Sequence, residues 1–298
     1  MSVLYNMERV HQPVLLKEVI QYLNIQSGSM FVDATLNGGG HVTGILEQYP
    51  DVKIIGIEFD PDIFAKFQLD PVAERIIATN DSYVHIQDIC QRHQFRPSAI
   101  LFDLGVSSHH YEMTRGFTFR YDQPLDMRFN PHLQTMTASD IVNGYGYEEL
   151  EEILMTYGEE AFADRIAKAI VGARQIRPIH TTSQLVEVVN HAVPAWYRHR
   201  KIHPATKTFQ AIRMEVNSEL DAIRTGITKA IQALEPQGRI AVISFHGLED
   251  KTVREVIKEH VTAGVISWVT KDTIKPTWAE VQKNPRARSA KMKIIQKL

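Results

Sequence analysis

Two acids and a run of glycines near the N-terminus have the residue types and spacing of a nucleoside-binding site. Asp33 ends one apolar run, residues 38–40 are three consecutive glycines, and Glu58 ends the next apolar run. A glycine-rich turn between a strand and a helix lets a ligand approach the backbone closely, and an acid that ends the second strand commonly binds ribose hydroxyls. The alternative is a structural turn, but together with Glu58 the pattern favours a nucleoside cofactor.

The glycine turn lacks the sequence of a phosphate-binding loop. No Gly-Lys-Ser/Thr follows it, and position 43 is Thr where the dinucleotide pattern G-x-G-x-x-G requires a third glycine. A cofactor without a pyrophosphate fits better. S-adenosylmethionine is the candidate, because its ammonium group can meet Asp33 and its ribose can meet Glu58. Asn37, just before the glycines, is expected at a positive φ, which Asn tolerates better than most residues.

A third acid, Asp103, ends the apolar run 99–103. In a parallel sheet this position lies near the point where the strand order reverses, and ligands bind there. An amino group on a nucleobase is a poor nucleophile. To attack a methyl-sulfonium it needs an acceptor for its N–H groups and a fixed in-line geometry. Asp103 could be that acceptor, or it could bind the amino-acid moiety of the cofactor or cap a loop.

The segments that must position these acids alternate along the first hundred residues. The segments expected as strands, each including a few residues after its apolar run, are 30–36, 52–60, 75–80 and 99–105. The segments with helical spacing or helical start signals are residues 11–23, 41–49 and 61–69. Alternation of strands and helices predicts a parallel sheet with right-handed crossovers.

The alternating pattern breaks after Ser108. Residues 109–135 are loop-like, and the helical segments that follow are 139–158, 160–174, 181–193 and 209–234. A strand followed by a helix returns at 238–260, and closing strands are expected at 264–272 and 289–298. We therefore predict an α/β domain formed by residues 1–108 and 217–298, interrupted by a mostly helical insertion at 109–216.

The composition is that of an ordinary globular protein. The 298 residues are 44% hydrophobic and 23% charged, and no apolar run approaches the roughly 20 residues of a membrane span. The N-terminal residues lack the apolar core of a secretion signal, so a cytoplasmic protein without membrane association is expected. The single cysteine, Cys90, excludes an internal disulfide and a multi-cysteine metal site.

Charge is distributed unevenly, although the formal net charge is only −2. Residues 196–213 carry five Lys or Arg and residues 281–298 carry six, and neither stretch contains an acid. Residues 147–164 carry seven acids and no Lys or Arg. A polyanion could bind the basic stretches locally, whereas the alternative is that they are solvated faces without a partner.

Eight motifs occur in one order and cover nearly the whole chain. They are "HQPVLLKEVI", "DATLNGGGH", "ILFDLGVSS", "RGFTFRYDQPLDMRF", "YGEEAFADRIAKAI", "HPATKTFQAIRMEVNSEL", "ISFHGLED" and "NPRARSA". Together they closely resemble the RsmH (MraW) family of ribosomal RNA small-subunit methyltransferases. The resemblance implies a class I S-adenosylmethionine-dependent methyltransferase domain, with a Rossmann-like α/β sheet, and an inserted helical domain that recognises RNA.

The resemblance also implies a reaction and a partner. The family transfers a methyl group from S-adenosyl-L-methionine to the exocyclic N4 of one cytidine, position 1402 of 16S rRNA, in the decoding centre of the small ribosomal subunit. We therefore expect 16S rRNA within that subunit as the partner, and the resemblance permits a homodimer.

The family motifs carry over to this sequence residue by residue. Beside Asp33, they imply cofactor contacts at Gly39, Gly40, His41, Glu58, Tyr83, Asp103 and His110, of which Asp103 is also the catalytic residue. Three of these positions differ from the usual family residue. Glu58 replaces Asp and keeps the ribose contact with a longer arm, Tyr83 replaces Phe beside the adenine, and His110 replaces Gln.

The stretch "RGFTFRYDQPLDMRF", which begins the insertion, alternates aromatic and cationic residues. An enzyme that acts on a nucleobase must take it out of its stack, and RNA-binding modules stack such bases on aromatic rings. Phe117, Phe119 or Tyr121 could hold the flipped cytosine. Arg115 and Arg128 could contact phosphate groups.

Each predicted RNA contact has a structural alternative. Arg128 could pair with Asp126 inside a loop that packs onto the sheet. Lys207 and Arg213 lie in an acid-free stretch and are predicted to contact the RNA backbone, but a solvated helix start is the alternative. His246 could line the base pocket or be a structural histidine. No metal is predicted, because the histidines lack a matching cluster of acids or cysteines.

Two other classes of function stay open on the residues alone. A methyltransferase for a small molecule or protein would have no use for the basic stretches and the large insertion. A non-catalytic RNA-binding module would have no use for the set of acids and glycines. In the favoured mechanism the methyl group passes directly to the amine, so no cysteine nucleophile is needed, and Cys90 lies on a helix-like segment away from the strand ends.

Overall fold

The chain forms two compact units. The structure is a computed structural model that describes residues 13–298. The first unit comprises the described residues up to Ser108 together with Leu220–Leu298, and the second is His109–Glu219. The sequence places the return of the α/β domain at residue 217, three residues before the first unit resumes. That the second unit recognises RNA stays a prediction.

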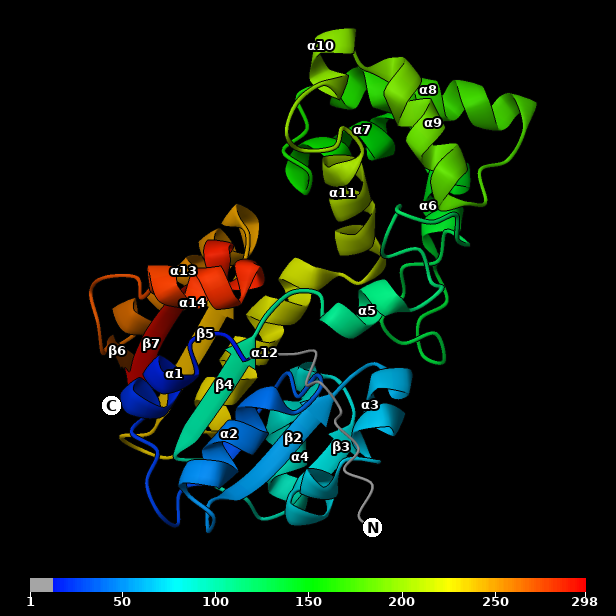
Figure 1. Cartoon of the computed structure of the whole chain (residues 1–298). Helices are drawn as coiled ribbons and strands as arrows, with labels where there is room; N and C mark the ends of the chain where they lie inside the picture. Colours follow the sequence, from blue (N-terminus) through cyan, green and yellow to red (C-terminus); the bar gives the residue numbers. More distant parts are fainter. Residues whose placement is uncertain (1–12) are drawn as a thin grey trace. The chain divides into compact units, whose positions relative to one another are not determined.

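The first unit is built on a seven-stranded sheet. Its strands are β1 (Met30–Asp33), β2 (Lys53–Glu58), β3 (Ile77–Asn80), β4 (Ala99–Asp103), β5 (Arg239–Ser244), β6 (Ile266–Trp268) and β7 (Lys291–Lys297). The order in the sheet is β3-β2-β1-β4-β5-β7-β6 (Figure 1). Neighbours from β3 to β5 are parallel, and β7 is antiparallel to β5 and β6. The α/β fold predicted from the alternating segments is confirmed.

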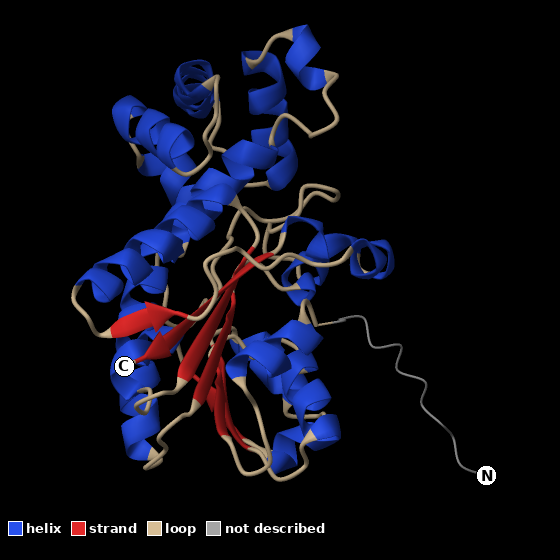
Figure 2. Cartoon of the chain, turned by 90° about the vertical axis from the view of Figure 1, so that its left-hand side faces the viewer, coloured by secondary structure: helices blue, strands red, loops and turns tan. Residues whose placement is uncertain are grey.

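Helices cover both faces of this sheet (Figure 2). They are α1 (Leu16–Leu23), α2 (Gly40–Gln48), α3 (Pro61–Phe67), α4 (Ile86–Arg92), α12 (Glu219–Ala233, of which all but Glu219 belongs to this unit), α13 (Gly247–Thr262) and α14 (Trp278–Lys283). Successive strand residues point to opposite faces, so Val32 and Phe102 join a core with α4, α12 and α13, whereas Phe31 and Leu101 join a core with α1 and α2. Among residues 13–298, no helix combines the length and apolarity needed to span a membrane.

The turn from β2 into α3 shows how the sequence starts a helix beside the site. The side chain of Asp60 accepts hydrogen bonds from the backbone N–H groups of Asp62 and Ile63, at 2.9 and 3.3 Å. Pro61 occupies the first helical turn, where its missing N–H has no helical partner to lose. The chain therefore ends β2 at Glu58 and begins α3 at Pro61, beside the carboxyl ends of the strands.

The second unit is mostly helical. Its helices are α5 (Ser108–Glu112, of which all but Ser108 belongs to this unit), α6 (Ala138–Gly144), α7 (Tyr147–Thr156), α8 (Ala163–Ile176), α9 (Thr182–Ala192), α10 (Ala195–Arg198) and α11 (Thr206–Val216). The irregular segment before α6 is tied to the end of α11. The side-chain amide of Asn217 donates to the carbonyl oxygen of Met127 at 2.8 Å and its oxygen accepts from the N–H of Phe129 at 2.9 Å.

Three sequence-based expectations about helices need correction. The segment 139–158 contains two helices, because the N–H of Gly146 is capped by Glu149 at 2.6 Å and starts a new one. The segment 209–234 also contains two, because Ser218 adopts φ +46° and ends the first. The segment predicted as a loop after Ser108 begins with the short helix α5.

Candidate active site

Three acids end three neighbouring strands of the sheet. Asp33, Glu58 and Asp103 are the last residues of β1, β2 and β4, and β1 lies between the other two strands. Asp33 is level with Gly56 and Leu101, so the neighbouring strands each continue two residues beyond it. The carboxyl groups therefore meet where the strand order reverses, which is where ligands of such sheets bind.

Burial raises the pKa values of all three acids. Desolvation raises the pKa of Asp33 to about 7 and that of Glu58 to about 8. The pKa of Asp103 is raised well above its ordinary value, first by burial and then by the nearby charges of Asp33 and Glu249. A positively charged ligand would stabilise the ionised forms of these groups. The electrostatics of the site therefore favour a cation.

The two carboxylate oxygens of Asp103 have different surroundings. Its Oδ2 lies 3.8 Å from Nδ1 of His41. Its Oδ1 is buried and accepts no hydrogen bond from any described residue. Nε2 of His41 donates to the carbonyl oxygen of Val14 at 2.9 Å, so Nδ1 is the ring nitrogen on the side of Asp103. A buried carboxylate oxygen without a hydrogen bond is unfavourable unless a ligand supplies the donor.

The glycine turn brings backbone N–H groups to the same edge of the sheet. Gly39 adopts φ +74° immediately before α2, and a Cβ at this position would lie 2.5 Å from the Phe67 ring. Glycine is therefore required for both conformation and space. Asn37 adopts φ +49°, as predicted, and its side-chain amide donates to the carbonyl oxygen of Thr35 at 2.9 Å. Gly40 is the first residue of the helix.

Tyr83 follows β3, in the short 3-10 helix η2 (Tyr83–His85), and is half-buried. Its ring meets the Phe102 ring edge-on, with the ring centroids 5.5 Å apart. A Cβ added at Gly226, on α12, would overlap the Tyr83 ring. A glycine on one element thus sets the position of the aromatic ring on another.

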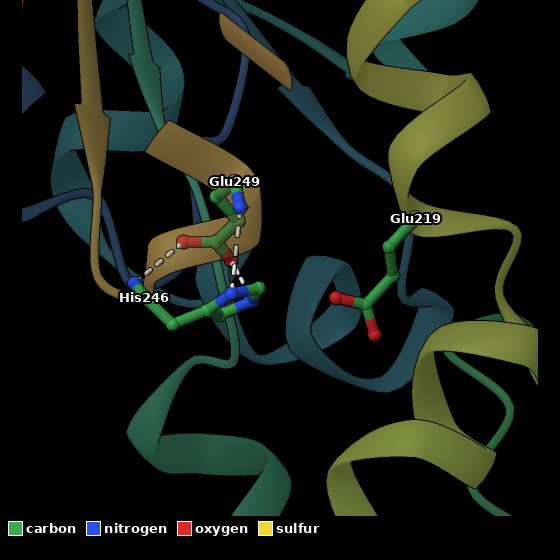
Figure 3. A group of neighbouring side chains, drawn as sticks. All are labelled: Glu219, His246 and Glu249. Carbon is green, nitrogen blue, oxygen red and sulfur yellow. Dashed lines mark hydrogen bonds and ion pairs between the residues drawn. The ribbon is translucent and has the colours of Figure 1, made fainter. Parts of the chain in front are cut away.

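His246 and Glu249 cap the start of α13, which follows β5 (Figure 3). Nδ1 of His246 accepts the backbone N–H of Glu249 at 3.4 Å, and its Nε2 lies 3.0 Å from Oε1 of Glu249. The Glu249 carboxylate also accepts the N–H of Phe245 at 2.7 Å. These contacts favour the structural alternative for His246. Its place in a base pocket stays a prediction.

The remaining predicted site residues belong to the second unit. His110, 5% exposed, packs against the rings of both Phe117 and Phe129, each with its centroid 4.9 Å away. Phe117 and Phe129 are stacked, with centroids 5.6 Å apart. Phe119 contacts Phe209, with ring centroids 4.9 Å apart. Phe117 is 8% exposed, so a base could stack on its ring only after local rearrangement, whereas Phe119 is half-buried.

The predicted phosphate contacts of this unit also have internal partners. The guanidinium of Arg128 donates to Asp126 at 2.8 and 2.7 Å, which is the internal pair that the sequence left open. That of Arg115 donates to the carbonyl oxygens of Arg128 and Phe129 at 3.0 and 3.1 Å. Lys207 and Arg213 are likewise engaged within the unit. The role of each in binding RNA stays a prediction.

A family model described as the MraW methylase family matches residues 8–298. The chain belongs to this family. Two similar relatives, from Persephonella marina and a Sulfurihydrogenibium species, are both named ribosomal RNA small subunit methyltransferase H. The first is 43% identical over 291 residues, which are 97% of this chain and 99% of the relative. The second is 42% identical over 287 residues, which are 95% and 98% of the two chains.

The family predicted from the motifs is thus confirmed, and the first unit has the Rossmann-like class I methyltransferase fold. The sequence of this MraW methylase did not reveal two groups that position Asp103 and His41. Thr35 accepts the N–H of Asp103 at 2.6 Å, and the carbonyl of Val14 holds His41. The motifs "DATLNGGGH" and "HQPVLLKEVI" contain both residues, but no residue type signals a contact between segments so far apart in sequence.

Proposed function

We propose that this protein transfers a methyl group from S-adenosyl-L-methionine to the exocyclic N4 of one cytidine, position 1402, of 16S rRNA in the decoding centre of the small ribosomal subunit. Membership of a methylase family and the names of the relatives support the class of reaction and the rRNA substrate. The observation that carries the chemistry is the buried Oδ1 of Asp103 at the end of β4, which accepts no hydrogen bond from any described residue.

The first unit has the groups that hold the cofactor. S-adenosyl-L-methionine supplies a methyl group activated by a sulfonium, and it carries a cationic ammonium as well. Asp33 is suited to the ammonium, because its pKa of about 7 would fall beside a positive charge. Glu58 is suited to accept hydrogen bonds from ribose hydroxyls, and Tyr83 to lie beside the adenine. Gly39 and Gly40 allow close approach of the ligand to the backbone.

Asp103 is the proposed catalytic residue. Transfer forms an N–C bond at N4 while the bond from the methyl group to sulfur breaks and its electron pair stays on sulfur. The methylated amine then releases one proton. Ionised Asp103 accepts a hydrogen bond from the amine through Oδ1, which orients the nitrogen, and then takes up the released proton. Its raised pKa makes it a stronger base than an exposed carboxylate. His41, beside Oδ2, is a positioning residue, and His110 stays a proposed cofactor contact.

The second unit is the proposed RNA-recognition domain. The cytidine must leave its stack to reach a site at the strand ends. Phe117 and Phe119 are the proposed stacking residues, and the buried Phe117 would first have to leave its contact with Phe129. We place the protein in the cytoplasm because its proposed substrate is there, and a homodimer is part of the proposal.

The decisive experiment uses labelled S-adenosyl-L-methionine. Unmodified small ribosomal subunits and naked 16S rRNA are offered separately, and the label is mapped by nuclease digestion and mass spectrometry. The proposal expects label on N4 of a single decoding-centre cytidine. Cofactor binding without any label on 16S rRNA would retain the methylase and overturn the substrate.

Two variants test the role of Asp103. Asp103→Ala should lower transfer by about a hundredfold or more, the contribution typical of a positioned acid or base. Cys90→Ala should retain transfer, because Cys90 is buried in the core and burial raises the pKa of its thiol to about 11. Loss of activity in a folded Cys90→Ala variant would contradict direct transfer.

A further inference from the structure

We propose that residues 196–203, which we name the α10 tip, form a docking surface for single-stranded ribosomal RNA. The tip includes most of α10 and the first part of the acid-free stretch 196–213. The proposal rests on the function proposed above and specifies where the second unit holds the RNA backbone.

The structure divides the acid-free stretch into two parts with different roles. Arg213 donates two hydrogen bonds to Glu219, at 2.6 and 2.9 Å, and both side chains are largely buried. Lys207 donates through Nζ to the carbonyl oxygen of Glu159, just beyond α7. Lys207 and Arg213, which the sequence analysis predicted as RNA contacts, therefore stabilise the second unit through internal hydrogen bonds. They are poorly placed to supply most of the phosphate contacts.

The cations of the α10 tip, in contrast, are exposed to solvent. Residues 198–203 are all exposed, and they include Arg198, Arg200 and Lys201. Trp196 is 63% exposed, which is unusual for the largest aromatic side chain. An exposed indole in the same short segment as three cations is a combination with which proteins bind unpaired nucleotides, because the ring can stack on a base and the cations can contact phosphates.

The tip is held in place by buried contacts beneath it. Tyr197 is 4% exposed, and its hydroxyl lies 2.9 Å from each carboxylate oxygen of Glu160. The Phe162 ring meets the rings of Tyr197 and Trp196 edge-on, with centroids 4.9 and 5.8 Å away. The guanidinium of Arg200 lies 5.0 Å from the centre of the Tyr197 ring. A surface fixed in this way loses little conformational entropy when it binds.

The charge of the tip favours RNA over a protein partner. The tip concentrates three cations without an acid between residues 196 and 213, and RNA presents a regular series of phosphates. The strongest competitor is a second copy of this chain, because α7 carries Glu148, Glu149, Glu151 and Glu152 and could pair with the tip. The measurement of RNA binding must therefore include the oligomeric state.

The test measures the affinity of the full chain for naked 16S rRNA at several salt concentrations. The variant Arg198→Gln/Arg200→Gln/Lys201→Gln removes three cations from the tip, and its matched control, Lys258→Gln/Lys271→Gln/Lys275→Gln, removes three exposed cations from the first unit. Each lost phosphate contact on a single strand lowers the slope of log affinity against log salt by about 0.7, so the tip variant should lose about two units of slope. The control should lose none.

A second variant tests stacking. Trp196→Ala should weaken binding about tenfold with an unchanged salt slope, because stacking on an aromatic ring is largely independent of salt. All variants should retain wild-type affinity for S-adenosyl-L-methionine, which reports an intact first unit.

Three outcomes would overturn the proposal, and they are distinguishable. Equal slopes for the tip variant and the control, with 16S rRNA still methylated by the wild type, would exclude the tip and leave the proposed function intact. A tip variant that changes from dimer to monomer by light scattering, with an unchanged slope, would assign the tip to a second copy of the chain. A wild type that binds cofactor but neither binds nor methylates 16S rRNA would remove the proposed function as well.

Discussion

The buried acids predict that cofactor affinity depends on pH. Asp33 must be ionised to pair with the ammonium group of S-adenosyl-L-methionine, yet burial raises its pKa to about 7. At pH 6 only about one molecule in eleven then has an ionised Asp33, and at pH 8 about ten in eleven do. Ionisation of Asp33 alone should therefore raise the affinity about tenfold over this interval, which is about 1.4 kcal/mol. Glu58, with a pKa of about 8, adds an effect of the same sign, because its ionised fraction also rises across this interval.

The same pKa shift acts on stability in the opposite direction. A carboxyl whose pKa is higher in the folded than in the unfolded protein binds its proton more tightly when folded. For Asp33 this stabilising contribution is complete below the ordinary pKa of 3.8 and is lost as the pH rises through about 7. The cofactor-free protein should therefore lose stability between pH 6 and pH 8, while the stabilisation that the cofactor adds should grow.

Calorimetry in two buffers of different ionisation enthalpy measures both the affinity and the protons released. Binding should release about 0.9 proton from Asp33 at pH 6 and about 0.1 at pH 8. Asp33→Asn should bind more weakly and lose the tenfold part of the pH dependence that comes from Asp33, whereas Glu74→Gln, an exposed control on the same unit, should behave as the wild type. An affinity that is constant from pH 6 to pH 8, or an unchanged pH profile in Asp33→Asn, would refute the reasoning.

Further predictions concern packing. Gly226→Ala should displace the Tyr83 ring, which would weaken cofactor binding in calorimetry and cost about 1–3 kcal/mol of unfolding free energy from overpacking. Gly172→Ala, on a helix where a Cβ meets nothing within 4 Å, should instead stabilise the protein by about 0.5–1 kcal/mol, and thermal unfolding of the two variants distinguishes these outcomes. Tyr197→Phe should lower stability by about 1–3 kcal/mol in denaturant unfolding, because it leaves the buried Glu160 carboxylate without the hydroxyl; an unchanged midpoint would show that this contact contributes nothing.

The sequence was sufficient for the parts of the molecule that depend on local patterns. Alternating apolar segments predicted the parallel sheet, and Asp33, Glu58 and Asp103 end strands because each directly follows a buried run. Asn37 has its predicted positive φ because few residues tolerate that conformation. In each case the evidence lay within a few residues of the position concerned.

Contacts between distant segments could not be predicted in the same way. The charge of Arg128 suggested phosphate binding, but its guanidinium is taken up by Asp126. The helical periodicity of residues 209–234 continues through a turn, which only the φ of Ser218 reveals. A Lys or Arg in a basic stretch gives the same sequence pattern whether its side chain faces solvent or pairs with an acid inside the protein. The difference is a property of packing, which sequence spacing does not encode.

The charges of the two units have different roles in the proposed reaction. Asp33, Glu58, Asp103 and Glu249 are buried acids of the first unit, and such an arrangement lowers stability unless a cation binds, so it is better explained by function than by folding. The same acids repel phosphates. The acidic site of the first unit can therefore favour a cationic methyl donor and a neutral base, but its carboxylates do not attract the RNA backbone. That attraction must come from elsewhere in the protein, and the exposed cations of the α10 tip are suited to provide it.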